Sequence, residues 1–315
     1  MSVSSWHKCG TPDEMTTKVQ HISICICTYK RPDLLWRLLS ELASQRTDGL
    51  FTLGIIVVDN DHSQSAKGAV AAFSASVSIP VHYYVEPQQN IALARNKAVE
   101  NADGDFVAFI DDDEIPPRHW LLTLFNACRE YGVDGVLGPV KPDFDGNVPR
   151  WVVKGGFYDR PTYRTGLVID GKKGRTGNVL LKKEIFTPGE QHFKPEFRTG
   201  EDQDFFRRMI KKGRVFIWCH EAVAYETVPA LRWKRTFMLR RALLRGATAV
   251  IHPTFGAKEI AKSVLAVPLY AAALPFALVA GQHRFMLLLV KLCDHLGKLL
   301  ALVGIQPIKE QYVTN

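Results

Sequence analysis

The chain has 315 residues, of which 46% are hydrophobic and 23% are charged. This composition excludes intrinsic disorder as the main state, and the length allows one large α/β domain with an appendage. The formal net charge of +8 is concentrated, because residues 205–245 hold 11 Lys/Arg against 2 Asp/Glu. Such a block indicates an anionic partner, either a diphosphate or an anionic membrane surface. The chain lacks helix-turn-helix, zinc-finger and RNP patterns, so we expect no nucleic acid partner.

Residues 1–20 form a polar N-terminal segment without the apolar core of a signal peptide. The six cysteines are scattered, with no CxxC pair and no Cys/His cluster at zinc spacing. We interpret them as reduced thiols of a cytosolic protein.

From residue 21 onward, apolar runs alternate with helical patterns, which is typical of a mostly parallel sheet with crossover helices. The expected fold class is therefore α/β, with a Rossmann-like, mostly parallel central sheet flanked by helices. Segment 141–175 is rich in Gly, Pro and aromatic residues, and is predicted to be a substrate-lining loop. Strands are predicted at 21–28, 53–60, 81–86, 105–111, 134–140 and 176–182, and helices from Asp33 and at 117–132 and 201–213.

Polar residues follow the first two predicted strands. CTYKRPD (27–33) offers the Thr28 hydroxyl, the Tyr29 ring and Arg31, a set suited to binding a nucleobase. VVDN (57–60) places Asp59 at the second strand end, where it can bind the base or the ribose. Because ligands of open parallel sheets bind at the carboxyl ends of strands, we expect one crevice to gather these residues.

The sequence ARNKAVENADGDFVAFIDDD leads into the fourth predicted strand, and Arg95 and Asn96 are predicted to open the helix before it. An arginine near a helix start can bind phosphate oxygens in bidentate fashion. The alternative is an exposed helix charge.

The densest signal is FIDDDEIPP (109–117), where an apolar strand ends abruptly in Asp111, Asp112 and Asp113. Adjacent carboxylates repel one another, so a fold keeps them together only where a cation or hydrogen-bond donors offset the repulsion. We predict Mg²⁺ or Mn²⁺ here. One carboxylate of this D-x-D can hold a ribose hydroxyl while the other holds a metal that bridges two phosphates. The alternative is a solvated acidic turn.

Residues 236–315 are expected to form a basic and apolar helical region. Stretch 264–280 has no charge, but it is short for a membrane span and contains Pro268 and Pro275. Candidate helix 284–304 carries one polar stripe on an apolar cylinder, which describes a helix lying in a membrane interface. The alternative is a helical hairpin packed on the main domain. The stripe consists of Lys291, Asp294, His295 and Lys298.

Five motifs follow one another in the order CTYKRPD, VVDN, ARNKAVENADGDFVAFIDDD, TGNVLLKKEIF and TGEDQDFFRRM. In this order they resemble the family 2 inverting glycosyltransferases with a GT-A fold, over about residues 20–230. Through AVAYETVPALRWKR (222–235) the chain looks most like bacterial exopolysaccharide enzymes of the succinoglycan type. The resemblance implies a catalytic domain at 21–235 and a nucleotide-diphosphate sugar donor, taken to be a UDP-sugar. It implies that Asp111 binds the ribose and that Asp113 binds the metal, with Asp111 as a second metal ligand. Asp112 is expected to lie next to the nucleotide. The implied nucleotide-binding residues are Thr28, Tyr29, Arg31, Asp59 and Arg95.

The resemblance also implies that Asp202 in GEDQD is the general base, with Glu201 beside it. Inversion needs one carboxylate to deprotonate the attacking hydroxyl while a metal stabilises the leaving diphosphate. The alternative is that both acids simply favour a helix N-terminus. Asn178 and Trp151 are candidates for the acceptor site, although aromatic residues commonly serve packing. Glu226 stands where many family members carry a histidine near the metal, so the third metal ligand is unassigned.

The implied reaction is transfer of a single sugar to a lipid-linked or saccharide acceptor, at the cytoplasmic face of the inner membrane, by a peripheral or monotopic enzyme. Arg232 and Trp233 resemble the RW pair of processive synthases, but the sequence has no run of transmembrane helices to form a polymer channel. One alternative is a sugar-phosphate nucleotidyltransferase, which normally opens with a Gly-rich loop that CTYKRPD lacks. Another is an inactive membrane-bound scaffold, against which Asp111, Asp113 and Asp202 argue.

Overall fold

The computed structural model describes residues 19–197, 200–251, 255–306 and 308, so nearly all of the N-terminal segment 1–20 lies outside the described residues. The main sheet has the strand order β3-β2-β1-β4-β8-β6-β9. β1 to β4 run parallel, and β8 lies antiparallel between β4 and β6. The mostly parallel α/β fold predicted from sequence is therefore confirmed. The strands are β1 (Gln20–Thr28), β2 (Phe51–Asp59), β3 (Val81–Val85), β4 (Phe106–Ile110), β6 (Gly135–Leu137), β8 (Asn178–Lys182) and β9 (Phe216–Trp218).

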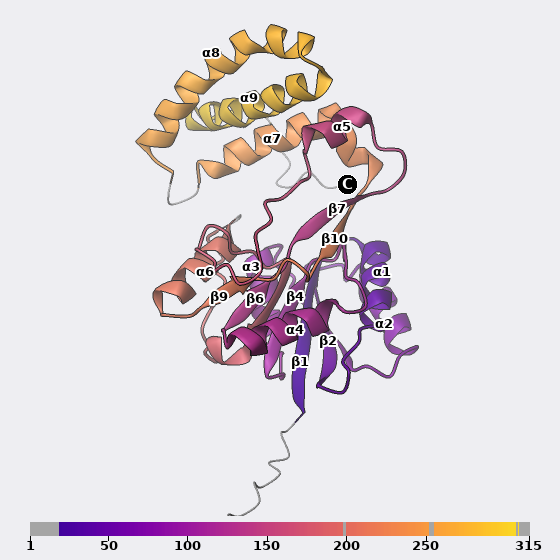
Figure 1. Ribbon diagram of the computed structural model, residues 1–315. Coiled ribbons are helices and arrows are strands. Elements are labelled where there is room, and N and C mark those ends of the chain that lie inside the picture. Colours follow the sequence, from indigo (N-terminus) through magenta and orange to yellow (C-terminus); the bar gives the residue numbers. More distant parts are fainter. Residues whose placement is uncertain (1–18, 198–199, 252–254, 307, 309–315) are drawn as a thin grey trace, which may run out of the picture.

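Helices cover both faces of this sheet (Figure 1). Leucines of α1 share one buried face and join a core with residues of α2 and α4, while α3 and α6 cover the opposite face. These continuous apolar faces exist because a parallel sheet is buried on both sides. The helices are α1 (Pro32–Leu42), α2 (Lys67–Ser74), α3 (Ile91–Glu100), α4 (Trp120–Tyr131) and α6 (Glu201–Lys211).

The start of α3 differs from the sequence prediction. Asn90 caps the helix by accepting a hydrogen bond from the Ala92 amide, so the helix begins at Ile91. Arg95 and Asn96 therefore lie in the middle of α3 and do not open it. Both are buried, because this part of the helix faces the sheet.

Segment 141–175 is not one continuous loop. It contains the end of β7 (Val140–Phe144) and a short helix, α5 (Arg150–Gly155). β7 belongs to a second sheet of order β5-β10-β7, with β5 at Glu114–Ile115 and β10 at Ala224–Val228. Short 3₁₀ turns follow β8 and β10, at Lys183–Ile185 and Ala230–Trp233. In Figure 1 the strands β7 and β10 lead from the main sheet toward the C-terminal helices.

The C-terminal region forms three helices, α7 (Arg235–Ala249), α8 (Ala257–Val279) and α9 (Gln282–Leu302), and α9 packs against α5, α7 and α8. α8 lies farthest from the main sheet in Figure 1. It runs through Pro268 and Pro275 without a break, contrary to the interrupted segment expected from sequence. A proline removes one helical hydrogen bond. α8 nevertheless continues past both prolines, and it packs along α9.

The predicted polar stripe of α9 does not face outward as expected, except at Lys291. Asp294 pairs with Arg245 of α7 at 2.7 Å and with Lys298 at 3.1 Å. His295 is buried, and its Nδ1 lies 2.9 Å from the Ser263 hydroxyl of α8. The stripe faces inward because these groups find partners on the neighbouring helices, where a polar group without a partner would be costly.

Gly246 and Gly297 let α7 and α9 approach closely. A Cβ at Gly246 would overlap the Asp294 carbonyl oxygen, and a Cβ at Gly297 would overlap the Leu243 carbonyl oxygen. Backbones can come this close only where no side chain intervenes.

We expect Gly246→Ala to lower the free energy of unfolding by about 1–3 kcal/mol, because the helix-propensity gain of alanine is outweighed by overpacking. The matched control is Gly68→Ala in α2, where an added Cβ meets nothing within 4 Å and stability should rise slightly. Thermal denaturation of both variants measures the difference. Equal melting temperatures for the two would show that α7 and α9 do not depend on this close contact.

Candidate active site

The carboxyl ends of β1, β2 and β4 meet at one edge of the main sheet, because Thr28 pairs with Asp59 in register and β4 pairs with the other side of β1. The predicted aspartates directly follow β4. The Thr28 hydroxyl donates a hydrogen bond of 2.8 Å to Asp112 Oδ2, which ties the end of β1 to the acidic turn.

Two arginines offset the charge of Asp112 and Asp113. Arg31 Nη1 lies 3.1 Å from Asp112 and 3.2 Å from Asp113, while Arg232 Nη2 lies 3.2 Å from Asp113. Both carboxylates are buried. Burial raises the pKa of Asp112 to about 6, although Arg31 acts in the opposite direction. Arg31 keeps a partly exposed side chain, at 32%, so it borders the solvent.

Asp111 is the most exposed of the three aspartates, with a side-chain exposure of 45%. Beside it lies Glu114, which is 1% exposed and whose Oε1 has no hydrogen-bond partner among the described residues. Burial and the neighbouring Asp111 hold the pKa of Glu114 well above its usual value. A Cβ at Gly177 would lie 2.8 Å from Glu114 Oε1 and 2.9 Å from Asp111 Oδ2, so only glycine leaves this space open.

Arg95 lies under this edge and is 7% exposed. Its guanidinium pairs with Glu201 and lies 3.8 Å from Asp111. Burial disfavours the charged form, but Glu201 and Asp111 together raise the pKa of Arg95. The arginine predicted to bind phosphate thus uses part of its hydrogen-bonding capacity on protein carboxylates, and Glu201 is half of a buried ion pair.

Asp202 has a different environment from Glu201. It is half-buried at the start of α6, and its Oδ1 accepts a hydrogen bond from the Gln203 amide. Electrostatic interactions link it to Arg95 and to Arg175. A carboxylate near a helix N-terminus is favoured by the helix dipole. Asp202 therefore presents a carboxylate with remaining acceptor capacity beside the aspartate turn.

Three further residues form a connected set of ion pairs to which the sequence alone gave no definite role. Glu226 of β10 pairs with Arg160 and, at 2.9 Å, with Arg232. Arg232 connects this pair to Asp113, while Arg160 contributes electrostatically to Asp111 and Glu114. Sequence reasoning missed Arg160 because it lies in an irregular segment with no motif. The RW pattern was the one available signal for Arg232.

The structure gives other predicted residues internal partners. Asp59 is fully buried and accepts hydrogen bonds from the amides of Asp61 and Ala66 and from the Tyr83 hydroxyl. It thereby holds the loop after β2. Tyr29 borders the same edge with the Lys30 ammonium 5.2 Å from its ring centre.

The two predicted acceptor residues also have structural contacts. Asn178 accepts a hydrogen bond from Trp120 Nε1 and donates to the Pro139 and Ala222 carbonyls, so its amide holds β8 in place. Trp151 lies on α5 and packs edge-to-face on Phe157.

The aspartate turn carries oxygen atoms of the kind that bind a divalent metal. Within the part of the chain that the structure describes, no group of three or more His, Cys, Asp or Glu side chains is placed to hold a metal by itself. Mg²⁺ in nucleotide-handling sites uses only one or two protein carboxylates, and substrate phosphates and waters complete the shell. Asp111 and Asp113 supply two oxygen donors of this kind, and beside Asp111 lies a Glu114 oxygen without a hydrogen-bond partner among the described residues. The donor set fits a metal that arrives with a diphosphate.

A model of the family described as glycosyl transferase family 2 matches residues 23–185. The succinoglycan biosynthesis protein ExoM of Rhizobium meliloti (strain 1021) is 33% identical over 309 residues, covering 95% of this chain and 97% of that protein. Among solved structures, the mannosyltransferase PcManGT from Pyrobaculum calidifontis, in complex with GDP-Man and Mn²⁺, aligns with a TM-score of 0.56 and 18% identity. That alignment covers 90% of this chain and 88% of the other.

A second similar structure is that of S. aureus TarS 1-349 in complex with UDP-GlcNAc. It aligns with a TM-score of 0.50 and 16% identity, over 91% of this chain and 93% of the other. At these identities both structures are evidence about the fold alone.

Proposed function

The chain belongs to the family 2 glycosyltransferases, and from that premise we propose that it transfers a single sugar, with inversion, from a nucleotide-diphosphate donor to a lipid-linked or saccharide acceptor. The family settles the choice against a nucleotidyltransferase, and the predicted GT-A fold is confirmed. The succinoglycan relative supports a role in exopolysaccharide biosynthesis.

The observation that carries the proposal is the cluster of acids and arginines at the strand edge. Asp111, Asp112 and Asp113 follow β4, with Glu201 and Asp202 at the start of α6 facing them through Arg95. A site that binds a nucleoside diphosphate with a metal, and also removes a proton, needs both acidic ligands and cations at close range. A solvated acidic turn would not be buried and paired in this way.

For the donor, we propose that Asp113, with Asp111 beside it, holds Mg²⁺ or Mn²⁺. When bound, the metal supplies Lewis-acid stabilisation of the leaving diphosphate. Arg31 is partly exposed next to Asp113 and can meet the same phosphates. Thr28 and Tyr29 border the place for the nucleoside, Asp59 shapes the loop beside it, and Asp112 holds Thr28 and Arg31 in position. We propose a UDP-sugar as the first donor to test, with a GDP-sugar as the second, since the TarS structure holds UDP-GlcNAc and the PcManGT structure holds GDP-Man.

For the acceptor, we propose Asp202 as the general base. Its carboxylate accepts the proton of the attacking hydroxyl while that oxygen forms a bond to the anomeric carbon. The bond from this carbon to the diphosphate oxygen breaks on the opposite face, so configuration inverts without a covalent enzyme intermediate. Glu201 serves as a positioning residue, because its buried pair with Arg95 fixes the start of α6 beneath Asp111.

We also propose that residues 21–235 are the catalytic domain and that 236–315 attach it to a membrane. α8 is long and apolar enough to cross a bilayer. Its apolar 18-residue stretch has a mean hydropathy of 1.7, and only 11% of that stretch is buried. Several exposed side chains of α8 are large and apolar, although Lys258 and Lys262 are exposed as well. By contrast, Ser263 of α8 and Asp294 of α9 contact polar groups of neighbouring helices. A water-soluble hairpin would have the reverse distribution. The exposed residues include Val264, Leu265, Leu269, Phe276, Leu278 and Val279.

The arrangement supports a monotopic attachment. α8 is the outermost helix and lies across the side of α9 that faces away from the sheet (Figure 1). The basic block 205–245 includes α7 and would attract anionic lipid headgroups, at about 1 kcal/mol for each Lys or Arg near the surface. The cytoplasmic face of the inner membrane carries such lipids, and a lipid-linked acceptor would reach the enzyme there.

The first prediction concerns the base. We expect Asp202→Asn to lower kcat by about 10² or more while the Kd for UDP with Mn²⁺ stays within threefold, because only proton removal is lost. Glu201→Gln is the comparison, and it should also lower the melting temperature because it weakens a buried ion pair. Turnover with UDP-sugars and calorimetric titration measure the two effects. A tenfold or smaller loss of kcat in folded Asp202→Asn would place the base elsewhere.

The second prediction concerns the metal. Asp113→Asn should retain hydrogen bonding to the arginines but abolish the part of UDP affinity that depends on Mn²⁺. The control is Asp48→Asn, in an exposed turn far from the site. Calorimetry with and without Mn²⁺ separates the two contributions, and an unchanged metal-dependent gain in Asp113→Asn contradicts the assignment.

The third prediction concerns the membrane. Replacing Leu265 and Leu269, which are 71% and 66% exposed, by Glu should reduce binding to anionic vesicles more than tenfold, because burial of each leucine contributes about 1.5–3 kcal/mol. Leu50→Glu is the control, since this leucine is 41% exposed on the catalytic domain. Vesicle cosedimentation at low and high salt provides the measurement. If both proteins bind equally, the exposed face of α8 does not enter the bilayer.

A further inference from the structure

A pocket of about 150 Å³ lies beside the carboxylate cluster and has no role in the mechanism above. It shares Gly177 and Arg160 with that cluster, but its floor comes from the other half of the main sheet, through Leu137 of β6, Asn178 of β8 and Trp218 of β9. Its volume is several times the roughly 30 Å³ that one water molecule occupies in the liquid. The pocket can therefore hold a small substrate group.

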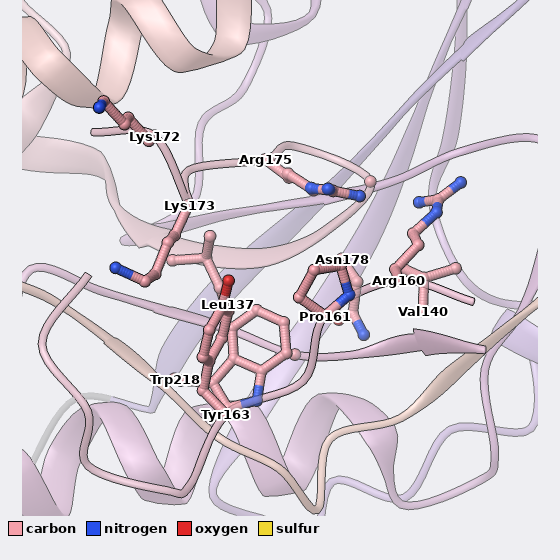
Figure 2. A pocket seen from close by; sticks show the side chains of 12 residues that line it. Leu137, Val140, Arg160, Pro161, Tyr163, Lys172, Lys173, Arg175, Asn178 and Trp218 are labelled. Atoms are coloured by element: carbon pink, nitrogen blue, oxygen red, sulfur yellow. The ribbon is translucent and has the colours of Figure 1, made fainter. Parts of the chain in front are cut away.

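The pocket is lined by cations. Segment 157–178 carries five Lys/Arg and two Asp, and four of these cations line the pocket. In the view of Figure 2, Lys172 and Lys173 lie to one side and Arg160 to the other, with Tyr163 and Trp218 between them.

Two of these four cations have side-chain partners among the described residues, and two have none there. Lys173 pairs with Asp170, and Arg160 pairs with Glu226. For Arg175 and Lys172, the described residues provide no side-chain hydrogen bond or ion pair. Burial and the adjacent Arg160 lower the pKa of Arg175, while Asp202 and Glu226 act in the opposite direction. The Arg175 side chain is exposed, so it can reach a ligand that enters from solvent.

Trp218 adds an unpartnered polar group to the residues that line the pocket. The residue is 4% exposed, and its Nε1 donor has no hydrogen-bond partner among the described residues. A buried indole N–H normally finds an acceptor, because leaving it without one costs about 1–3 kcal/mol. Tyr163 packs edge-to-face on the Trp218 ring, with ring centres 5.1 Å apart. Aromatic rings with a few polar groups are typical of small-molecule pockets.

Resting on the proposed function, we propose that this pocket binds an anionic group, a phosphate or a carboxylate, of the acceptor saccharide. Arg175 and Lys172 hold the anion, and Tyr163 and Trp218 contact the sugar that carries it. The proposed donor residues, Thr28 and Arg31, lie at β1, on the opposite side of β4 from the pocket. Arg175 also interacts electrostatically with Asp202, which links the pocket to the proposed base.

The test measures sugar binding by calorimetry to the full-length protein, with UDP and Mn²⁺ saturating the donor site. Three probes are used: glucose 1-phosphate for the phosphate source, glucuronate for the carboxylate source, and neutral methyl glucoside. At least one anionic sugar should bind tenfold or more tightly than methyl glucoside, and the tighter of the two identifies the source. Equal or absent binding of both anionic sugars relative to methyl glucoside would overturn the inference.

Variants then localise the site. Arg175→Gln should weaken binding of the anionic sugar at least tenfold and leave the Kd for UDP with Mn²⁺ unchanged. Trp218→Phe, which keeps an aromatic ring but removes the N–H donor, should weaken it about threefold to tenfold. The matched control is Arg118→Gln, at an exposed position outside the pocket. If Arg175→Gln weakens UDP binding instead, Arg175 serves the donor phosphates and the inference is wrong.

The failure of the proposed function gives a different result. In that case the unaltered protein binds no UDP and turns over no nucleotide sugar, whatever the binding of the anionic sugars. Loss of the acceptor inference alone leaves UDP binding and the effect of Asp202→Asn intact.

Discussion

The repulsion among carboxylates at one sheet edge is the constraint on which the rest of this structure depends. Asp111, Asp112 and Asp113 follow a strand that is buried on both faces, so they cannot separate from one another. Arginines from three distant parts of the chain offset their charge, and each of them fixes a segment in place. The loop after β1, helix α3 and the turn after β10 are joined in this way. Electrostatic balance thus positions the elements that surround the site.

The same balance separates two chemical environments. On the β1 side, Arg31 is partly exposed beside the aspartates, where a metal and a diphosphate can enter. On the β8 side, Gly177 leaves space next to Glu114, and the pocket beyond it is cationic, with an Arg175 that has no ion pair within the described part of the chain. Asp202 lies near both environments. A donor and an acceptor approaching from opposite sides would meet at the carboxylate proposed to take the proton.

The C-terminal helices solve a different physical problem. Several of their polar groups pair between helices, and glycines at the α7–α9 contact allow close packing, while α8 exposes large apolar side chains. This distribution is unfavourable in water and favourable at a bilayer surface, where polar groups need internal partners. α5 packs against α9, so the orientation of the helical layer is coupled to the segment that leads into the acceptor pocket.

The sequence by itself determined the α/β fold, most strands of the main sheet and the acidic turn, because burial gives strands a local apolar pattern and the aspartates are contiguous. It did not predict β9 or the second sheet, whose strands are short. It could not place Arg95 or Arg232 against particular carboxylates, since those pairs join residues far apart in the chain. The sequence also predicted that the polar stripe of α9 faces outward, which was wrong. Periodicity shows which residues share a helical face, but it does not show which element packs against that face. Only the tertiary structure decided these contacts, which depend on how distant segments meet.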